Sequence, residues 1–454
     1  MANTAIRRDP MSGDYTSKGT WSFWIKNTQP HVGTLSNNEN KGIFMLRKGN
    51  SYTASRLRIY LDDNDKLIFE LKDSGGSDDS FIKTNAQLFD YSAWYHICMS
   101  YDSTLGTAAD RLKMWINGKD ARTELGGFQS DDQVSSNFQY LASSAMMLSL
   151  GRVDENNGVS RYFNGSMAEC YFIYGSTYDV STFGETDSTT GEWVPKLDIA
   201  SGITFGSQGF YFKFNNSADM KADSSGNSNT YVIDGTMTQT KDTPSDPFNQ
   251  INTLVKTYGG SPTFSNANLT YEGTSSWNYP VASYGADSGK FYWECNFTNI
   301  NNNGGLGVVS QAFSTSNLEN NGTAYNSTDG AVLYWHDGSK YINGSNSTYG
   351  SAITTNTVVG VALNLDSATK TVTYYLNNVS QGAIDLPTNM QTDFVYPVLM
   401  GNSGSQTYKA QYNFGSGYFG TSAVTSADTS SGGIFEFAPP ANHKPWSTVK
   451  GLNQ

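Results

Sequence analysis

Apolar and polar residues alternate with a period of two along most of this chain, in short runs that polar turns separate. In residues 94–121 an apolar run reaches an Asp, crosses a polar turn, returns as an alternating run and ends on Asn-Gly. Residues 357–382 follow the same order, with Asn-Asn in place of Asn-Gly. Because successive side chains of a strand point to opposite sides of a sheet, each segment predicts a central antiparallel hairpin.

One face of each predicted hairpin is apolar and should be buried in a core. In the first hairpin that face holds Ile97, Met99 and Tyr101, matched by Leu112, Met114 and Ile116. In the second it holds Val359, Val361, Leu363 and Leu365, matched by Val372, Tyr374 and Leu376. Two such hairpins in separate halves of the chain indicate two β-sandwiches, each with its own core.

The other alternating runs support this division. In the first half we expect strands at residues 19–26, 42–48, 56–73, 93–102, 111–118, 146–153 and 167–175. A loop-like stretch covers 176–208, and a further strand pair is expected within 209–236, joined by the turn "DSSGNSN". In the second half we expect strands at 289–297, 304–310, 331–344, 394–401 and 408–415.

The predicted fold class is therefore all-β, with two tandem antiparallel sandwiches of jelly-roll type. A single all-β sandwich commonly takes about 200–250 residues, and the chain has 454. We expect the first sandwich in residues 1–240, a linker in 241–257, and the second sandwich with a C-terminal tail in 258–454. The linker is placed on "TKDTPSDPFNQ", which contains two prolines and few apolar residues.

Composition narrows the classes of function. Charged residues make up only 15% of the chain, and the formal net charge is −12. An acidic surface repels a phosphate backbone, so we expect no nucleic-acid partner. No run of about 18 apolar residues is present, and the N-terminal "MANTAIRRDPMSGDY" lacks the apolar region of a secretory signal. We therefore expect neither membrane insertion nor secretion.

The chain has three cysteines, Cys98, Cys170 and Cys295, each within a strand-like run. An odd and low count argues against a disulfide framework, and a free cysteine in a strand behaves as a small apolar residue. We expect all three thiols to be reduced and mostly buried.

The first half resembles the laminin-G-like or pentraxin-like concanavalin A sandwich. The resemblance rests on Trp94-Tyr95-His96-Ile97, on Tyr101-Asp102, and on "MWING", "LGR" and "YFNGSMAECYFIYG" further along the chain. The second half, about 258–419, resembles a SPRY domain. Together the two resemblances imply that both predicted sandwiches are of the concanavalin A-like kind.

The SPRY resemblance rests on "GKFYWECNF", "GLGVVS", "VVGVALNLDSATKTVTYYLNNVSQG", "YPVLMG" and "YNFG". Asn364 and Asn378 stand where the SPRY pattern usually has Asp and Gly. Three other stretches resemble sequence motifs that recur in virion proteins of tailed, often marine, bacteriophages. They are "FGETDSTTGEWVPK", "FYFKFNNSADMKADSSGNSN" and "GGIFEFAPP". Those proteins join a concanavalin A-like domain to a SPRY-like domain, as this chain does.

This resemblance implies a structural or adhesion protein on the surface of a phage particle, a tail fibre or head fibre that contacts host surface glycans. A purely architectural role in capsid decoration or tail assembly is the alternative, and a glycan-degrading enzyme is the third. The protein would then be located in the virion, after assembly in the host cytoplasm. Its expected partners are other virion proteins, host surface polysaccharide and further copies of the chain in a homo-oligomer.

Catalytic chemistry has weak support in the sequence. Glucanases on a concanavalin A sandwich carry paired carboxylates on one strand, where alternation aims them into one cleft. The nearest candidate is "GETDSTTGE", with Glu185, Asp187 and Glu192, but its Ser, Thr and Gly residues predict a solvated loop. Cys98 and His96 would share a strand face without a third, orienting group. We expect no catalytic residues and no enzyme.

Metal chemistry has little support either. The histidines His31, His96, His336 and His443 are isolated and lack zinc-ligand spacing. Calcium could use the oxygens of "DDND", which is Asp62, Asp63, Asn64 and Asp65, or of "DSGGSDDS", which contains Asp73, Asp78 and Asp79. Neither stretch matches an EF-hand, and β-turns favour Asp and Asn in any case. We expect no cofactor and no metal.

Aromatic residues around an Asp-Gly turn give the one candidate binding site. The segment "YWHDGSKYING" places Trp335, His336, Asp337, Tyr341 and Asn343 close together in the sequence. Sugars stack on exposed aromatic faces, while Asn and Asp side chains bind sugar hydroxyls. The same rings would also fit the buried side of a hairpin in the sandwich core.

Overall fold

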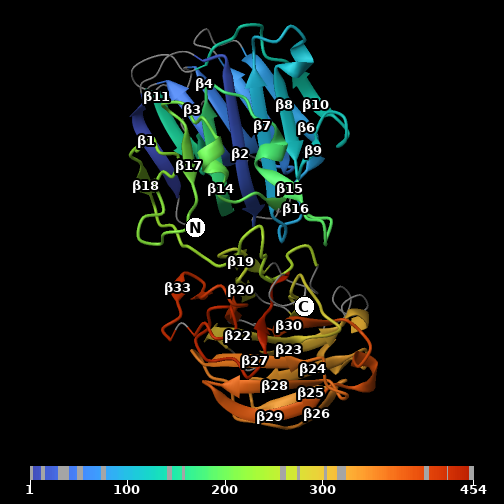
Figure 1. The fold of residues 1–454 in the computed structure, drawn as a ribbon. Coiled ribbons are helices and arrows are strands. Elements are labelled where there is room, and N and C mark those ends of the chain that lie inside the picture. Colours follow the sequence, from blue (N-terminus) through green and yellow to red (C-terminus); the bar gives the residue numbers. More distant parts are fainter. Residues whose placement is uncertain are drawn as a thin grey trace. The chain divides into compact units, whose positions relative to one another are not determined.

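The computed structural model (Figure 1) describes residues 4–11, 16–28, 40–48, 55–72, 78–140, 146–155, 159–255, 262–273, 277–300, 304–313, 324–402, 408–426 and 428–448. The chain divides into two compact units, Met1–Gln239 and Thr240–Gln454. Each unit is built from antiparallel sheets with only short helical turns, which confirms the predicted all-β class. No helix of the described residues is long and apolar enough to cross a membrane.

The first unit is a sandwich of an eight-stranded and a six-stranded sheet. The eight-stranded sheet has the order β10 (Phe128–Asp132), β6 (Asp78–Gln87), β5 (Lys66–Lys72), β4 (Arg56–Leu61), β3 (Lys41–Lys48), β11 (Met146–Leu150), β1 (Ala5–Met11) and β18 (Val232–Asp234). The six-stranded sheet has the order β17 (Phe210–Phe212), β14 (Gly165–Tyr174), β2 (Lys18–Asn27), β7 (Tyr95–Asp102), β8 (Leu112–Ile116) and β9 (Lys119–Asp120).

Smaller elements complete this unit. They are the strand pairs β12 (Arg152–Asp154) with β13 (Ser160–Tyr162) and β15 (Gly184–Thr186) with β16 (Trp193–Pro195), and the 3-10 turns η1 (Ala108–Asp110), η2 (Val180–Thr182) and η3 (Ile199–Gly202). The stretch 176–208, predicted as loop-like, packs Val180, Phe183 and Phe205 against Cys98, Trp115 and Tyr171, which lie on the outer face of the six-stranded sheet. The outer face is therefore covered by a second apolar layer.

The first predicted hairpin is β7 and β8, and the residues predicted to share a face pair with one another: Ile97 faces Ile116, Met99 faces Met114, and Tyr101 faces Leu112. All six side chains belong to the core between the two sheets. The strand pair expected within 209–236 is not a pair. β17 joins β14 in the six-stranded sheet while β18 joins β1 in the eight-stranded sheet, because each finds an open edge on a different layer.

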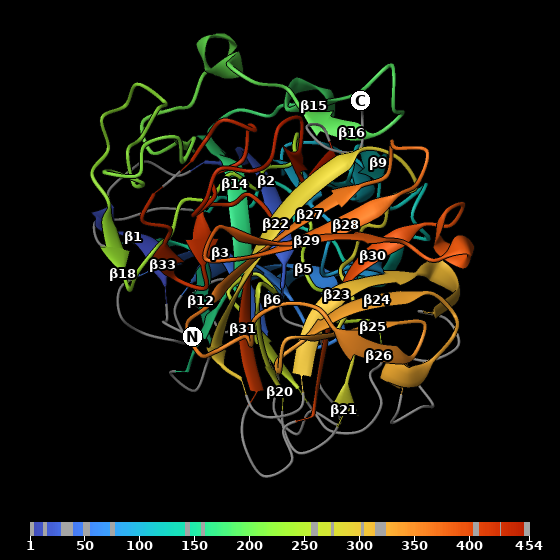
Figure 2. The ribbon, with the colours of Figure 1, turned by 90° about the horizontal axis from the view of Figure 1, so that it is seen from below.

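The second unit is also a sandwich, and Figure 2 shows its two layers from below. One sheet contains, in order, β19 (Thr263–Ser265), β20 (Thr270–Gly273), β31 (Tyr408–Asn413), β22 (Lys290–Asn299), β27 (Val358–Asn364), β28 (Thr371–Leu376) and β29 (Val379–Asp385), with β34 (Lys444–Pro445) parallel to β22. The other contains β21 (Trp277–Asn278), β30 (Val395–Asn402), β23 (Gly304–Ser310), β24 (Ala331–Trp335), β25 (Ser339–Ile342) and β26 (Ser345–Thr348).

The remaining elements of this unit are β32 (Tyr418–Phe419) with β33 (Ser422–Ala423), η4 (Ala324–Asn326) and η5 (Thr388–Met390). The second predicted hairpin is β27 and β28, and again the residues predicted to share a face pair with one another: Val359 faces Leu376, Val361 faces Tyr374, and Leu363 faces Val372. These residues and Leu365 lie in the core between the sheets.

Each hairpin is followed by a turn asparagine that adopts a left-handed backbone conformation and also accepts a hydrogen bond through its side chain. Asn117 has φ +49° and Asn377 has φ +44°, a left-handed conformation that Asn tolerates better than most residues. The side chain of Asn117 also accepts a hydrogen bond from the backbone N–H of His96 at 2.7 Å, and that of Asn377 accepts one from Val358 at 3.0 Å. Asn378, where the SPRY pattern has Gly, is left-handed as well, with φ +69°.

The C-terminal tail is part of the second sandwich. The Trp446 ring is fully buried and stacks on Phe291 with a centroid distance of 4.5 Å. The buried carboxylate of Glu294 accepts the backbone N–H groups of Glu436 and Phe437 at 2.9 and 2.8 Å. These contacts fix the segment "GGIFEFAPP" against β22.

The predicted linker also differs in the structure, because its described part is packed into the second unit. Phe248 and Ile251 are 3% and 1% exposed. The N–H of Asn249 donates to the carbonyl of Trp446 at 2.8 Å, which ties the segment to the tail. The linker was predicted from two prolines and few apolar residues, but these two apolar side chains are buried.

Candidate functional site

The predicted binding residues lie on β24, on β25 and in the turns that follow these strands. Trp335 ends β24, Tyr341 lies in β25, and Leu333 on β24 pairs with Tyr341. Strand alternation places Val332 and Tyr334 in the core between the sheets. It places Leu333 and Trp335 on the opposite, outer face of the sheet, where a separate apolar cluster forms.

Four rings meet on that outer face, and we call Trp277, Tyr325, Trp335 and Tyr341 the aromatic cluster. The Trp335 centroid lies 5.2 Å from Tyr341, 5.5 Å from Tyr325 and 6.1 Å from Trp277. Trp277 and Tyr325 are 4.8 Å apart. These spacings are those of favourable aromatic pairs.

The four rings differ in how much surface they leave open. Trp335 is only 4% exposed, whereas Trp277, Tyr325 and Tyr341 are half-buried. Trp335 therefore supports the cluster from within, and its three neighbours carry the accessible ring surface. Val309, Val398 and Met400 lie in the same apolar cluster from neighbouring strands. The rings are tilted or edge-on to one another, so they present a mixture of ring faces and ring edges on the sheet.

The polar predicted residues have defined partners. The Asp337 side chain accepts hydrogen bonds from the backbone N–H and the hydroxyl of Ser339, at 2.9 and 2.6 Å. Partial burial acts to raise the pKa of Asp337, but these hydrogen bonds outweigh it and lower the pKa below its ordinary value. Asp337 is thus an exposed, ionised acceptor at the end of β24.

His336 and Asn343 are placed differently. Partial burial lowers the pKa of the His336 ring, against the nearby Asp337 carboxylate, which acts to raise it. The Nδ1 atom of His336 is enclosed and has no hydrogen-bond partner in the described part of the chain. Asn343 serves the β25–β26 turn, since its φ is +44° and its side chain accepts the N–H of Ala331 at 3.1 Å.

Sequence reasoning missed Trp277 and Tyr325. Trp277 lies in the two-residue strand β21, and Tyr325 in the single turn η4, so neither stands in an alternating run. Both stand in polar segments without an alternating pattern that would predict their burial. This feature could have marked them as rings at the surface. The structure brings them to Trp335 and Tyr341 from more distant parts of the chain.

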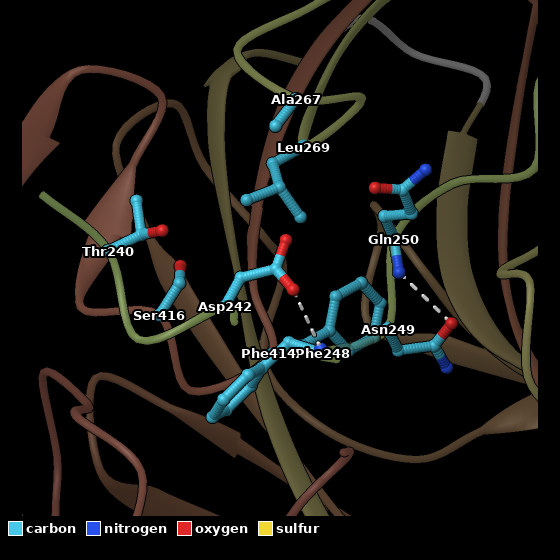
Figure 3. A pocket seen from close by; sticks show the side chains of 9 residues that line it. All are labelled: Thr240, Asp242, Phe248, Asn249, Gln250, Ala267, Leu269, Phe414 and Ser416. Carbon is cyan, nitrogen blue, oxygen red and sulfur yellow. Dashed lines mark hydrogen bonds between the residues drawn. The ribbon is translucent and has the colours of Figure 1, made fainter. Parts of the chain in front are cut away.

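A small hollow lies elsewhere in the second unit (Figure 3). Phe248, Leu269 and Phe414 give it apolar walls, and Thr240, Asp242 and Ser416 lie at its rim. Its volume is about 20 Å³, which is room for roughly one water molecule. The Asp242 carboxylate is engaged by the backbone N–H of Phe248 at 3.2 Å. The hollow is too small for a sugar or a nucleotide.

The carboxylates considered for catalysis lie on the β15–β16 hairpin. Asp187 accepts the backbone N–H groups of Thr189 and Thr190, both at 2.8 Å, which lowers its pKa. Glu185 is exposed and 3.8 Å from the ammonium of Lys196, and Glu192 is exposed. These carboxylates therefore lie on a surface hairpin, where Asp187 stabilises the turn.

The same hairpin completes a buried network around His96. Trp193 donates from Nε1 to Nδ1 of His96, and Nε2 of His96 lies 2.8 Å from the hydroxyl of Ser22. Trp24 stacks on the imidazole with a centroid distance of 4.9 Å. His96 and Ser22 are both 0% exposed. This Ser–His pair is sealed from solvent.

The "DDND" turn uses its acidic groups within the fold. Asp62 pairs with the ammonium of Lys83, and Asp65 pairs with that of Lys41. Asp65 also accepts hydrogen bonds from Asn27 at 2.8 Å and from the Tyr91 hydroxyl at 2.7 Å. Ammonium groups thus stand where a calcium ion would need to bind.

Other candidate metal ligands give no further site. Within the described ranges no group of three or more His, Cys, Asp or Glu side chains could hold a metal ion. His31 and Asp73 lie outside those ranges, as do the side chains of Asp78 and Asp79. All three cysteines are within them; they are buried and form no disulfide.

Comparison with known proteins bears on the first unit. Residues 3–181 match the Laminin_G_3 family model of the concanavalin A-like lectin/glucanases superfamily. The first unit contains a concanavalin A-like domain. This agrees with the two-layer sandwich of β1–β18 and with the resemblance carried by Trp94–Ile97. No curated protein matches the sequence.

Solved structures similar to the chain include SPRY domains and a pentraxin. The SPRY domain of human HERC1 is 20% identical, with 33% of this chain and 91% of that chain covered and a TM-score of 0.28. A human SPRY domain is 17% identical over 34% and 96% of the two chains, with a TM-score of 0.26. The SAP-like pentraxin of Limulus polyphemus is 15% identical over 39% and 72%, with a TM-score of 0.28.

Proposed function

We propose that this chain is a non-enzymatic adhesion protein on the surface of a phage particle, where it binds host surface glycans through the aromatic cluster. The virion setting comes from the sequence resemblance of "FGETDSTTGEWVPK" and "GGIFEFAPP". The observation that carries glycan binding is the group of three half-buried rings, Trp277, Tyr325 and Tyr341, around the buried Trp335.

The chemistry of the cluster suits a sugar. The C–H faces of a pyranose ring are apolar and pack on aromatic rings, while its hydroxyls need polar partners beside them. Asp337 is an exposed acceptor in the turn after Trp335. A surface cluster of rings suits an extended polysaccharide, which needs no deep pocket.

The non-enzymatic part of the proposal rests on the carboxylates. Glycoside hydrolysis needs two carboxyl groups held about 5–9.5 Å apart on either side of the scissile bond. Glu185, Asp187 and Glu192 lie on a surface hairpin with turn and lysine partners. Asp62 and Asp65 are paired with lysines.

The test compares ring removals that keep the fold. Trp277→Ala and Tyr341→Ala should each reduce retention on immobilised host-envelope polysaccharide by about tenfold, or about 1.4 kcal/mol. Tyr418→Ala is the matched control, because Tyr418 is half-buried in the same unit but lies outside the cluster. Equal retention of all three variants, with unchanged unfolding curves, would refute glycan binding at this cluster.

An architectural role in capsid decoration or tail assembly is the second candidate. The observation in its favour is that the half-buried rings lie in an apolar cluster with Val309, Val398 and Met400, a surface that also suits a protein partner. In that case the aromatic cluster would be covered by a neighbouring virion protein. Loss of assembly, with unchanged polysaccharide retention, in Trp277→Ala would support this role over adhesion.

A further inference from the structure

The sheet that carries the aromatic cluster ends in an open edge strand. β26 is the last strand of that sheet, and its residues Ser345, Asn346, Ser347 and Thr348 are all exposed. None of them is charged, although the chain carries a net charge of −12. An uncharged strand with unpaired backbone groups is a template for pairing with another strand.

The register shows which backbone groups are open. Asn343 and Gly344 form a two-residue turn with φ +44° and +81°, so Ile342 and Ser345 are its hydrogen-bonded closing pair. Such pairs alternate with pairs whose groups point outward. Asn346, opposite Tyr341, and Thr348, opposite Ser339, therefore turn their N–H and C=O groups away from β25.

Three other sheet edges of comparable or greater length carry charges or a bulge, and the edges β9, β17, β19 and β21 are only two or three residues long. β10 ends on Asp131 and Asp132, and β18 ends on Asp234. β29, the edge of the facing sheet, is interrupted by a register shift opposite Thr373–Tyr375. Charges and bulges of this kind prevent edge-to-edge association. β26 has neither.

We infer that a second copy of this chain adds its own β26 to this edge, in antiparallel orientation about a two-fold axis at Ser347. With that register Asn346 of one copy faces Thr348 of the other, twice. Both residues turn their backbone groups outward, so the pairing forms hydrogen bonds on each side of the axis. Their side chains can also bond across the strands, as Asn and Thr do.

The absence of charge on β26 favours a second copy over a foreign strand. Two copies of an acidic chain repel each other wherever like charges face across an axis, and no residue of β26 is charged. The facing sheet also ends close by, at β29, which begins with Val379. β29 and the segment after β26 are neighbours, since the hydroxyl of Tyr349 donates to the carbonyl of Gly382.

Such pairing would continue one sheet through both copies and bring two aromatic clusters onto it, since Tyr341 lies directly opposite Asn346. This consequence rests on the proposed function. Two linked clusters would raise retention on a polysaccharide surface without any new contact to sugar.

The first experiment measures the mass of the full chain by sedimentation equilibrium over a range of concentrations. The wild type should approach the mass of two chains. Asn346→Pro should remain a single chain, because proline removes an outward N–H that the β25–β26 hairpin does not use. Asn346→Ala keeps that N–H and is the control that should still pair. A wild type that stays single, or an Asn346→Pro variant that still pairs, overturns the inference.

The second experiment tests the axis and does not depend on proline. Ser347 would face its own copy, so Ser347→Lys and Ser347→Glu should each abolish pairing, while an equimolar mixture of the two should restore it. No restoration in the mixture would exclude this register, and a foreign strand partner would give none. The sedimentation mass tests only the pairing of two chains, whereas polysaccharide retention by Trp277→Ala tests the proposed function. The two proposals can therefore fail separately.

Discussion

The indole nitrogen of Trp193 donates a hydrogen bond to Nδ1 of His96 over 3.0 Å. Because Nδ1 is the acceptor, the ring proton of neutral His96 sits on Nε2 and points to the Ser22 hydroxyl at 2.8 Å. A histidine that activates a serine must accept its proton, and this tautomer instead donates one. The Ser22–His96 pair is therefore a structural element that fastens the β15–β16 hairpin to the outer face of the sheet.

We predict that this network makes the first unit less stable in acid. Burial lowers the pKa of His96 to about 3, from an ordinary value of 6.5. The unfolded chain therefore takes up this proton below pH 6.5 while the folded chain does not. Stability should fall as the pH drops from 6.5 toward 3, by up to about 1.4 kcal/mol per pH unit. Calorimetric unfolding at several pH values measures this slope. His96→Gln should remove the part of the slope that comes from protonation of His96.

Trp193→Phe tests the hydrogen bond itself. It leaves Nδ1 of the buried His96 without a donor and should lower the free energy of unfolding by about 1–3 kcal/mol. Trp277→Phe, a similar change at a half-buried ring, is the control. An unchanged stability in Trp193→Phe would mean that the indole N–H does not hold the hairpin.

The second unit should respond to pH with the opposite sign. Burial raises the pKa of Glu294 to about 7, against hydrogen bonds from the N–H groups of Glu436 and Phe437, from Asn413 and from Tyr292, which act to lower it. The folded chain keeps this proton to a higher pH than the unfolded chain. Stability should therefore fall as the pH rises from about 4.5 to 7, by up to about 1.4 kcal/mol per unit.

Glu294→Gln should flatten that slope and also loosen the tail. The amide nitrogen would face a donor, either Asn413 or a backbone N–H, at a cost of about 1–3 kcal/mol. Proteolysis of the C-terminal segment is a direct readout of tail release. Glu272→Gln is the control: its partner Lys409 is 3.3 Å away at a half-exposed site, and its effect should be within about 0.5 kcal/mol.

We predict that Asp65 stabilises the first unit through Lys41 and not through a metal. Asp65→Asn leaves Lys41, which is 5% exposed, without its carboxylate and should cost about 3–5 kcal/mol. The double change Asp65→Asn with Lys41→Met should recover part of that loss. A chelator should leave the thermal midpoint of the wild type unchanged, and a drop that calcium reverses would contradict this assignment.

The cysteines should not react with a thiol reagent until the protein unfolds. Cys98, Cys170 and Cys295 are buried, and burial raises the pKa of each thiol above its ordinary value. Thiol titration without reductant should count none in the native protein and three after denaturation. A count of one after denaturation would indicate a disulfide.

Period-two alternation was enough to predict both hairpins and the side chains on their buried faces, because strand geometry fixes which side chains share a face. The pairs Ile97–Ile116 and Val361–Tyr374 are local in sequence and lie in runs with an unambiguous apolar side. The all-β class follows from the same signal repeated along the chain. Alternation could also assign Trp335 to a strand, but not say which of its two sheet faces would be covered.

Tertiary structure alone decided what meets on the outer faces. Trp277 and Tyr325 come to Trp335 from segments with no periodic pattern, and Trp193 reaches His96 across 97 positions of sequence. Such contacts depend on how loops cross a sheet, and no local propensity encodes that path. The strands are thus determined by short-range alternation, whereas the aromatic cluster and the sealed histidine arise only when distant irregular segments pack onto them.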